Sequence, residues 1–309
     1  MAENILVTGG AGFIGSHTVD LLISRGYKVT VLDDLSTGKK ENINKEAKFI
    51  FSDITRLDIK KFKKIDAVIH CAAQISVAHS VRDPVNDASI NVLGSLNLLE
   101  MCRKLGVKKF VFASTGGAIY GSAPKTFPIK ENQTEAPESP YAASKKSTEL
   151  YMNFYMKTYG IDCISLRYAN VYGPRQDYLG EAGVIAIFIN QLLRNQKPVI
   201  FGNGMQTRDF VYVEDVALAN LTALNKKTTS KKINIGTAKE TSIDNLFNLI
   251  TRLMDKHAKP VYENPRKGDV MRSSLDIRLA WKELGWKPEV KIEDGLRRTA
   301  EWFSLEKKG

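Results

Sequence analysis

The sequence predicts an α/β protein built on a doubly wound parallel sheet, with a smaller, interleaved C-terminal α/β lobe. Three observations predict this class. Short β-branched runs alternate with long helical patterns through the first 168 residues, a glycine-rich turn follows the first run, and the second run ends in an acidic residue. Short apolar strands separated by helices are typical of parallel sheets that are covered on both faces.

The N-terminal part of the chain contains six apolar runs with the length and composition of strands. Helical patterns follow the first, fourth and fifth of these runs. The expected strands are 4–8, 28–32, 48–52, 66–73, 108–114 and 162–168, and the expected helices are 13–25, 83–105 and 140–159.

The pattern loosens after residue 168, where the turn-rich stretch NVYGPRQ (170–176) follows. We therefore predict a dinucleotide-binding domain over 1–168 and a substrate-binding lobe over 169–309, with a segment at 207–238 that returns to the first domain. Further helices are expected at 183–195, 214–224, 242–255, 276–284 and 293–305, and a further strand at 232–236.

Composition restricts the class of protein. The 309 residues are 43% hydrophobic, as in folded globular proteins. No apolar run approaches the ~18–20 residues of a membrane span, and no hydrophobic leader pattern follows the N-terminus. Three cysteines without paired spacing indicate a reducing compartment, and four scattered histidines do not predict a metal site. We expect a cytoplasmic protein that does not bind a membrane.

The net charge is +11, from 45 basic and 34 acidic residues. The lysines fall in short runs, with acidic residues inside the first of them and no interleaved aromatic residues for base stacking. This pattern favours a solvated surface and an anionic small-molecule substrate over nucleic acid, which remains a minor alternative.

The stretch VTGGAGFIG (7–15) places glycines at Gly9, Gly12 and Gly15, between a strand and a helix. The first glycine permits a tight turn, the second lets the backbone approach a pyrophosphate, and the third allows close packing of helix on strand. The helix N-terminus then directs N–H groups and partial positive charge at the phosphates. This context predicts a Rossmann-type dinucleotide site.

Acidic residues end the second and third strands. Asp33 can accept hydrogen bonds from both ribose hydroxyls and would repel a 2′-phosphate, which favours NAD over NADP as the cofactor. Asp53 suits two roles equally well, because it can face the adenine or cap a helix N-terminus.

Three reactive groups can converge near the end of the fifth strand. Ser114 and Thr115 provide hydroxyls at a strand end, where ligands of open α/β sheets bind. Tyr141 and Lys145 in SPYAASKKS lie one helical turn apart on the same face. An ammonium beside a phenol favours the phenolate, so Tyr141 could act as a base on a substrate alcohol. The alternative is a surface pair on an amphipathic helix.

The motifs TGGAGFIG, STGGAIYG, SPYAASK, LRYANVYGPRQ and TRDFVYVEDVA, in this order, resemble the extended short-chain dehydrogenase/reductase family. Within that family they are most similar to UDP-hexose 4-epimerases. The resemblance extends from Ile5 to the segment near Gly295. It implies reversible 4-epimerisation of a UDP-hexose through a 4-keto sugar, with NAD retained, and a homodimer formed through the helices near 83–105 and 140–160.

The resemblance also implies roles for single residues. It implies Thr115, Tyr141 and Lys145 as the catalytic set, although an added glycine after the hydroxyls leaves Ser114 open. It implies cofactor contacts by Gly9, Gly12, Phe13, Ile14, Gly15, Asp33, Asp53, Ile54, Ala72, Ala73, Asn91, Tyr141, Lys145 and Tyr168. Asn170, Arg208 and Arg266 match groups that hold the nucleotide-sugar, and Asp269 matches an acceptor for the nucleotide ribose.

Two further positions bear on the reaction and the substrate. Relatives that eliminate water have an acid pair where this chain has Gly116 and Gly117, so a 4,6-dehydratase or a sugar-acid decarboxylase is the less favoured alternative, and a non-catalytic NAD-sensing protein is more remote. Ser273 matches a position that lines the sugar pocket, where a small residue resembles enzymes that admit N-acetylated sugars. The resemblance therefore favours UDP-GlcNAc and UDP-GalNAc, with UDP-Glc and UDP-Gal as further substrates.

Overall fold

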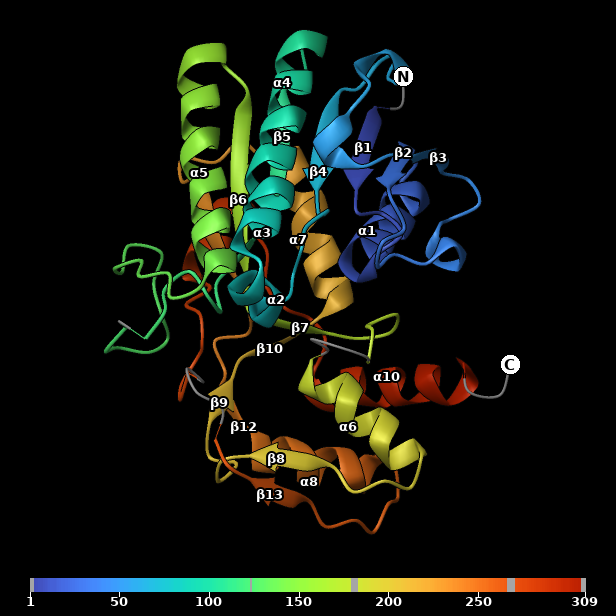
Figure 1. Ribbon diagram of the computed structural model, residues 1–309, viewed down its shortest axis with the longest axis vertical. Helices are drawn as coiled ribbons and strands as arrows, with labels where there is room; N and C mark the ends of the chain where they lie inside the picture. Colours follow the sequence, from blue (N-terminus) through green and yellow to red (C-terminus); the bar gives the residue numbers. More distant parts are fainter. Residues whose placement is uncertain (1–2, 123, 179–182, 266–269, 307–309) are drawn as a thin grey trace.

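A computed structural model describes residues 3–122, 124–178, 183–265 and 270–306, and shows a parallel seven-stranded sheet above a smaller lobe (Figure 1). The strand order is β11-β6-β5-β4-β1-β2-β3. The predicted α/β class with a parallel sheet is confirmed. The strands are β1 (Asn4–Thr8), β2 (Lys28–Asp33), β3 (Lys48–Phe51), β4 (Ala67–His70), β5 (Lys109–Thr115), β6 (Asp162–Tyr168) and β11 (Lys232–Ile235).

On one side of β1 the sheet continues with β2 and β3. On the other side it continues with β4, β5 and β6, so the strand order reverses direction between β1 and β4. The registers align the carboxyl ends of neighbouring strands, with Thr8 opposite both Leu32 and His70. A crevice outside the carboxyl ends at such a reversal is where open α/β sheets bind ligands. The fold therefore places a ligand site beyond β1 and β4.

Helices cover both faces of this sheet (Figure 1). Neighbouring residues of β1 show why, because Ile5 and Leu6 are both fully buried and belong to different apolar clusters. Since successive side chains of a strand point to opposite faces, each face needs its own cover. One cluster includes α1 (Phe13–Ser24) and α7 (Val213–Asn225), and the other includes α4 (Ser95–Leu105) and α5 (Pro140–Tyr159).

The helix expected over 83–105 is not a single continuous α-helix. The segment is divided into α3 (Pro84–Ala88), a wider π-helical stretch (Ser89–Gly94) and α4, and α2 (Val77–Arg82) precedes it. The Asn91 carbonyl accepts hydroxyl hydrogen bonds from Ser95 and Thr148, which compete with the regular helical ladder. π-helical insertions of this kind frequently lie at functional sites.

The smaller lobe surrounds a separate apolar core of aromatic and aliphatic side chains. Its helices α6, α8 and α10 pack on short strand pairs, and the paired strands β7 and β10 lie between this lobe and the large sheet (Figure 1). The remaining elements are α6 (Val184–Leu193), α8 (Ile243–Leu253), α9 (Arg278–Leu284), α10 (Ile292–Glu306), β7 (Asn170–Tyr172), β8 (Val199–Phe201), β9 (Thr207–Arg208), β10 (Phe210–Tyr212), β12 (Thr241–Ser242), β13 (Val261–Glu263) and the short 3₁₀ turns Lys40–Asn42, Ile54–Arg56 and Ile59–Lys61.

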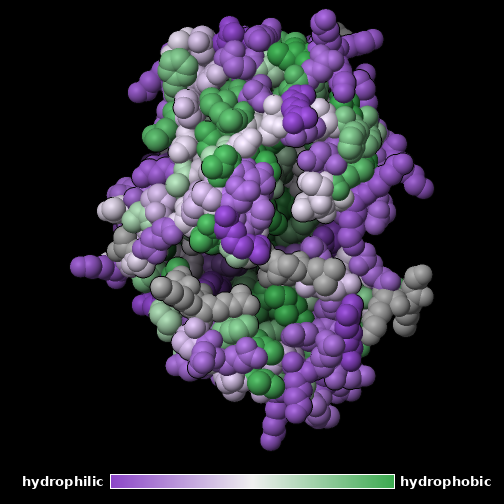
Figure 2. Space-filling model, viewed as in Figure 1, coloured by the Kyte–Doolittle hydropathy of each residue, from purple (hydrophilic) through white to green (hydrophobic). Residues whose placement is uncertain are grey.

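The chain crosses between the two parts more than once. It returns from the smaller lobe through α7 to β11, which pairs with β6 at the edge of the large sheet. The surface is hollowed where the two parts meet (Figure 2). Assignment of 1–168 and 169–309 to separate domains stays a prediction. Among the residues that the structure describes, no helix combines the length and apolar character needed to cross a membrane.

Candidate active site

The turn after β1 is shaped for close backbone approach. Gly9 adopts φ +68°, and a Cβ there would lie 2.6 Å from the Ala72 backbone nitrogen. A Cβ on Gly15 would lie 2.0 Å from the carbonyl oxygen of Gly9, so α1 could not approach the turn with any larger residue. Gly12 precedes the first residue of α1. The turn therefore requires glycine at Gly9 and Gly15, and it leaves an open cradle at the helix N-terminus.

This cradle forms one wall of a cavity of about 170 Å³ beyond the carboxyl ends of β1, β2 and β4. Glycines and the α1 N-terminus supply a wall suited to a pyrophosphate, and an acid suited to a ribose lies opposite. The residues present therefore fit a dinucleotide. The predicted cofactor contacts that line the cavity are Gly9, Gly12, Phe13, Ile14, Gly15, Asp33, Ile54, Ala72 and Ala73.

The two predicted acidic contacts, Asp33 and Asp53, have different positions and hydrogen-bond partners. Asp33 is 6% exposed, and its oxygens accept hydrogen bonds from the backbone N–H groups of Ala11 (2.9 Å) and Leu35 (2.8 Å). Burial raises the pKa of the Asp33 carboxyl. Asp53 instead caps the turn Ile54–Arg56, accepting from the backbone and hydroxyl of Thr55. Of the two roles that the sequence allowed for Asp53, the structure shows the capping role.

Asn91 stands behind the cofactor cavity and does not line it. Its side chain accepts a hydrogen bond from the Gln74 backbone N–H (3.0 Å) and donates to the Gln74 carbonyl (2.9 Å). Through these bonds Asn91 fixes the chain that leaves β4, immediately after Ala72 and Ala73. Its predicted cofactor role is therefore indirect in this structure.

The alternation of side chains along β5 separates the two candidate hydroxyls. Thr115 lines a second cavity together with Tyr141, and it forms a side-chain hydrogen bond with that phenol. Ser114 is buried on the other face and donates to the Glu149 carboxylate at 2.7 Å. Because consecutive strand residues point to opposite faces, only one of the two can face the cavity. The geometry favours Thr115 over Ser114.

Local sequence explains how α5 presents its two reactive side chains. The Ser139 hydroxyl accepts from the Ala142 backbone N–H, and Pro140 occupies the first helical position. Lys145 is 3% exposed, and its Nζ donates to the Ala113 carbonyl at 3.0 Å. That Nζ lies 5.9 Å from the centroid of the Tyr141 ring. The predicted pair is therefore together, and it is buried against the end of β5.

Burial disfavours the phenolate of Tyr141 and the ammonium of Lys145, which are the reactive charge states of the two groups. It raises the pKa of Tyr141 to about 12, with the negative charge of Asp87 acting in the same direction and the Thr115 hydrogen bond acting against it. Burial also lowers the pKa of Lys145 to about 8. Burial of Tyr141 therefore outweighs the effect that the sequence predicts for a neighbouring ammonium.

The second cavity has a volume of about 330 Å³ and lies between the sheet and the smaller lobe. Tyr168 is held there by a hydrogen bond from its hydroxyl to Asn220 (2.6 Å). Arg208 donates from Nη1 to the carbonyls of Thr207 (2.9 Å) and Val270 (2.6 Å). Arg266 and Asp269 lie outside the described residues. The predicted site residues that line this cavity are Thr115, Tyr141, Tyr168, Asn170, Arg208 and Ser273.

Sequence reasoning missed several lining residues, among them Val77 and Glu138, and a buried ionic network behind the site. Arg167 is fully buried and donates to Glu149 (3.0 Å from Nε) and to Glu135 (2.7 Å from Nη2). The network joins β6 to α5 directly beside Tyr168. The spacing of Glu149 four residues after Lys145 was the available signal, and it resembles an ordinary helix-surface pattern.

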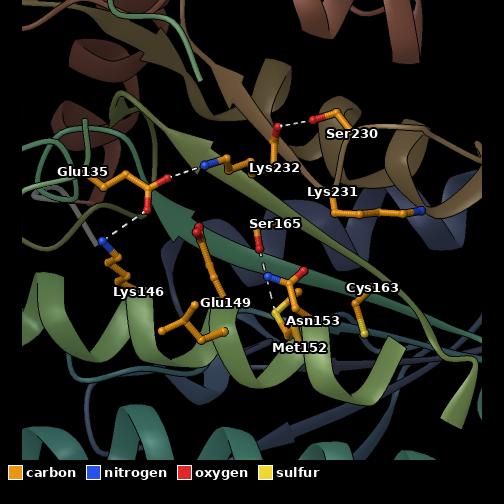
Figure 3. A pocket seen from close by; sticks show the side chains of 11 residues that line it. Glu135, Lys146, Glu149, Met152, Asn153, Cys163, Ser165, Ser230, Lys231 and Lys232 are labelled. Atoms are coloured by element: carbon orange, nitrogen blue, oxygen red, sulfur yellow. Dashed lines mark hydrogen bonds and ion pairs between the residues drawn. The ribbon is translucent and has the colours of Figure 1, made fainter. Parts of the chain in front are cut away.

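A further cavity of about 270 Å³ lies on the other side of α5, away from the reactive pair. Figure 3 shows Lys146 and Lys232 reaching Glu135 within it, at 3.5 and 2.5 Å. These lysines neutralise the carboxylate that also holds Arg167. The cavity therefore belongs to the support of the site, and its Glu135 carboxylate is already paired.

The chain is similar to known proteins over nearly its whole length. The model of the "NAD dependent epimerase/dehydratase family" matches residues 5–236. A UDP-glucose 4-epimerase of Thermotoga maritima, solved with UDP-glucose, is 50% identical with a TM-score of 0.95, and the match covers 98% of this chain and 99% of that one.

Two other solved structures are similar over the whole chain. A UDP-N-acetylglucosamine 4-epimerase of Methanobrevibacter ruminantium, in complex with UDP-N-acetylmuramic acid, is 39% identical, with a TM-score of 0.94 and coverage of 99% and 100%. A UDP-glucose 4-epimerase of Thermus thermophilus, in complex with NAD, is 43% identical, with a TM-score of 0.89 and coverage of 97% and 99%. The prediction of NAD as the cofactor is confirmed.

Proposed function

Because this chain belongs to the NAD-dependent epimerase/dehydratase family, we propose that it interconverts C4 epimers of UDP-hexoses. The substrates in this proposal are UDP-GlcNAc and UDP-GalNAc, with UDP-Glc and UDP-Gal also accepted. The prediction that the chain is an enzyme of the UDP-hexose 4-epimerase type is confirmed by its relatives. The choice of sugar and the mechanism are the proposed steps.

The observation that carries the proposal is the meeting of Thr115, Tyr141 and Lys145 at the boundary between the glycine cradle and the second cavity. In this arrangement the glycine cradle and Asp33 would hold NAD, which when bound would supply the acceptor and donor of hydride for C4 of the sugar. The remaining steps are proton transfers and substrate positioning by the protein.

Tyr141 is the proposed base for the C4 hydroxyl, and it returns the same proton when the 4-keto sugar is reduced. Thr115 holds the sugar oxygen beside the phenol. Since burial raises the pKa of Tyr141 to about 12, the phenol is protonated at rest and needs nearby positive charge in order to react. Lys145 supplies one such charge, and an oxidised nicotinamide supplies another.

The second cavity supports a nucleotide-sugar as the substrate. Asn170 and Arg208 lie on the side of the smaller lobe, where a guanidinium can contact a diphosphate. Ser273 is 5% exposed and lines the same cavity. A serine occupies less volume than a tyrosine, so this wall leaves room for an N-acetyl group. Holding the diphosphate firmly while few groups grip the hexose allows the 4-keto sugar to turn between faces.

The test is a product assay with four UDP-sugars. We expect each of UDP-GlcNAc and UDP-GalNAc to yield the other, and the glucose pair to do the same. Tyr141→Phe should abolish turnover and leave NAD bound, whereas Ser273→Tyr should lose the N-acetylated pair and keep the glucose pair. A stable 4-keto product from the wild-type protein would instead identify a dehydratase.

We also propose a homodimer that forms through α5. This helix exposes Leu150 (61%), Tyr151 (43%) and Phe154 (49%) on its outer face. Apolar side chains gathered on one helix mark an interaction surface. Light scattering of the purified protein should give twice the chain mass of 34.5 kDa, and Phe154→Glu should give the single chain mass. A wild-type protein of single chain mass would contradict the dimer. The cytoplasmic location stays a prediction.

A further inference from the structure

We propose that the buried carboxylate of Asp87 is a positioning residue for the catalytic pair: it fixes the first turns of α5 through Ser144 and keeps Lys145 in its cationic form. The proposal rests on the epimerase function above, and it assigns a role to a residue on a different helix from Tyr141 and Lys145. It also explains why α3 and the π-helical stretch are packed against α5.

Asp87 lies in α3 and is fully buried. One oxygen accepts hydrogen bonds from the side chains of Gln74 (2.8 Å) and Asn91 (3.0 Å), and the other accepts from the Ser144 hydroxyl (2.6 Å). All three donors are neutral. The carboxylate is thus held rigidly and well solvated by hydrogen bonds, while none of these donors carries a compensating charge.

Ser144 connects Asp87 to the helical turn that carries the reactive pair. Ser144 immediately precedes Lys145 and follows Tyr141 by three residues on α5, so all three lie within about one helical turn. Its bond to Asp87 therefore ties this turn to α3. Because Asn91 also fixes the chain after β4, the same network links α5 to the wall of the cofactor cavity.

The other ionisable groups that face Lys145 cannot supply this charge. Cys71, at the end of β4, has its pKa raised by burial to about 12, and it is a neutral thiol near neutral pH. His70, on β4, has its pKa lowered by burial to about 3, and it is neutral as well. Glu149 lies one turn along α5, and its negative charge is compensated by the ion pair with Arg167.

Asp87 therefore remains as the uncompensated carboxylate among these neighbours. Its charge raises the pKa of Lys145 against the burial that lowers this pKa to about 8. The same charge adds to the burial that raises the pKa of Tyr141, whose other polar neighbour, Thr115, acts in the opposite direction. Asp87 thus stabilises the ammonium and disfavours the phenolate, so its removal should lower both pKa values together.

The test replaces Asp87 by Asn, which preserves shape and removes charge. We expect the pKa of Lys145 to fall by on the order of one pH unit, which is the scale for the loss of one nearby charge. This pKa is read without turnover, from the rate at which trace acetic anhydride labels Lys145 between about pH 6 and about pH 10, quantified by peptide mass spectrometry.

The second readout is the pH profile of turnover. Both limbs should move to lower pH in Asp87→Asn, and activity on the alkaline side should be roughly tenfold below wild type for each pH unit that the alkaline limb moves. Ser144→Ala keeps the charge and removes the tether, so it should lower kcat and leave the Lys145 pKa in place. Asp215→Asn is the matched control, because Asp215 is also a buried carboxylate (3% exposed) but caps residues near Glu289.

An unchanged Lys145 labelling midpoint in a folded Asp87→Asn protein would overturn the proposal. So would an equal change of midpoint in Asp215→Asn, because the effect would then not depend on the position of the charge. The labelling experiment needs no substrate. A wild-type protein without epimerase activity would therefore refute the proposed function while the role of Asp87 in charging Lys145 is still decided.

Discussion

The turn after β1 offers a quantitative test, because Gly9 and Gly106 have nearly the same φ and different surroundings. Gly9 has φ +68° and Gly106 has φ +69°. A Cβ on Gly9 would lie 2.6 Å from the Ala72 nitrogen and 2.8 Å from the Ala72 Cα, whereas a Cβ on Gly106 would meet nothing within 4 Å. Substitution of each by Ala separates backbone strain from steric overlap.

The magnitudes follow from these contacts. Placing Ala in the left-handed region costs about 1–2 kcal/mol at either position. At Gly106 that is the whole effect, so we expect a free energy of unfolding lower by about 1 kcal/mol. At Gly9 the clash is with backbone atoms, which cannot rotate away as a side chain can. The total loss should therefore exceed about 3 kcal/mol, in the range that marks severe overpacking.

The assay has two parts. Urea denaturation gives the free energy of unfolding, and titration with NAD followed by protein fluorescence gives the Kd. Gly106→Ala should keep the wild-type Kd, since it lies at the C-terminal end of α4. Gly9→Ala should weaken NAD at least about tenfold, because relief of the clash moves Ala72 in the cavity wall. Equal losses of stability in the two variants would refute the reasoning.

Three other outcomes are expected. Arg167→Met should lower the free energy of unfolding by about 3–5 kcal/mol in urea denaturation, because Glu149 is left buried without its partner. Thr115→Ala should reduce kcat far more than Ser114→Ala does, and comparable losses in steady-state assays would contradict the assignment of the hydroxyl. The pKa of Lys145 is lowered from 10.5 to about 8, so the unfolded chain binds its proton more tightly, and the contribution of Lys145 to stability should rise from about pH 8 upward, by up to about 3 kcal/mol over the full window, while the buried cysteines act in the opposite direction. This contribution is read as the difference in the free energy of unfolding between wild type and Lys145→Met, measured between about pH 8 and about pH 9, below the range in which the tyrosines titrate.

Much of the sheet follows from the sequence alone, because a buried parallel strand needs only a short apolar run between turns. The strand expected over 162–168 matches β6 to the residue. The strand expected over 66–73 is wrong at its end, since β4 stops at His70. The following alanines continue the apolar pattern, yet their backbone leaves the sheet to form the cavity wall, and hydropathy does not distinguish the two states.

Local geometry explains the glycines that the sequence singled out, whereas a residue whose partners are remote in the chain left no signal in the sequence. Gly9 and Gly15 are fixed by clashes that any side chain would cause. Asp87 gave no signal, because its three donors come from separate segments and an Asp near a Pro reads as a helix cap. The capping role in fact belongs to Asp83, four residues earlier.

The spacing of Tyr141 and Lys145 predicts their contact but not their charge states. The four-residue spacing of Tyr141 and Lys145 correctly indicates that the side chains meet, and it suggests that the ammonium makes the phenol acidic. The fold adds an opposing effect, because desolvation moves the pKa of Tyr141 up to about 12 and that of Lys145 down to about 8. Burial penalises whichever form is charged, so it acts against both members at once. The phenol of such a pair stays protonated at neutral pH until further positive charge arrives beside it. The same burial that suppresses the pair at rest makes each added charge more effective, since the surroundings are poorly polarisable. The reactivity of Tyr141 should therefore depend on its ligands more steeply than the spacing alone implies, and the pH at which Tyr141 titrates should fall when oxidised NAD binds.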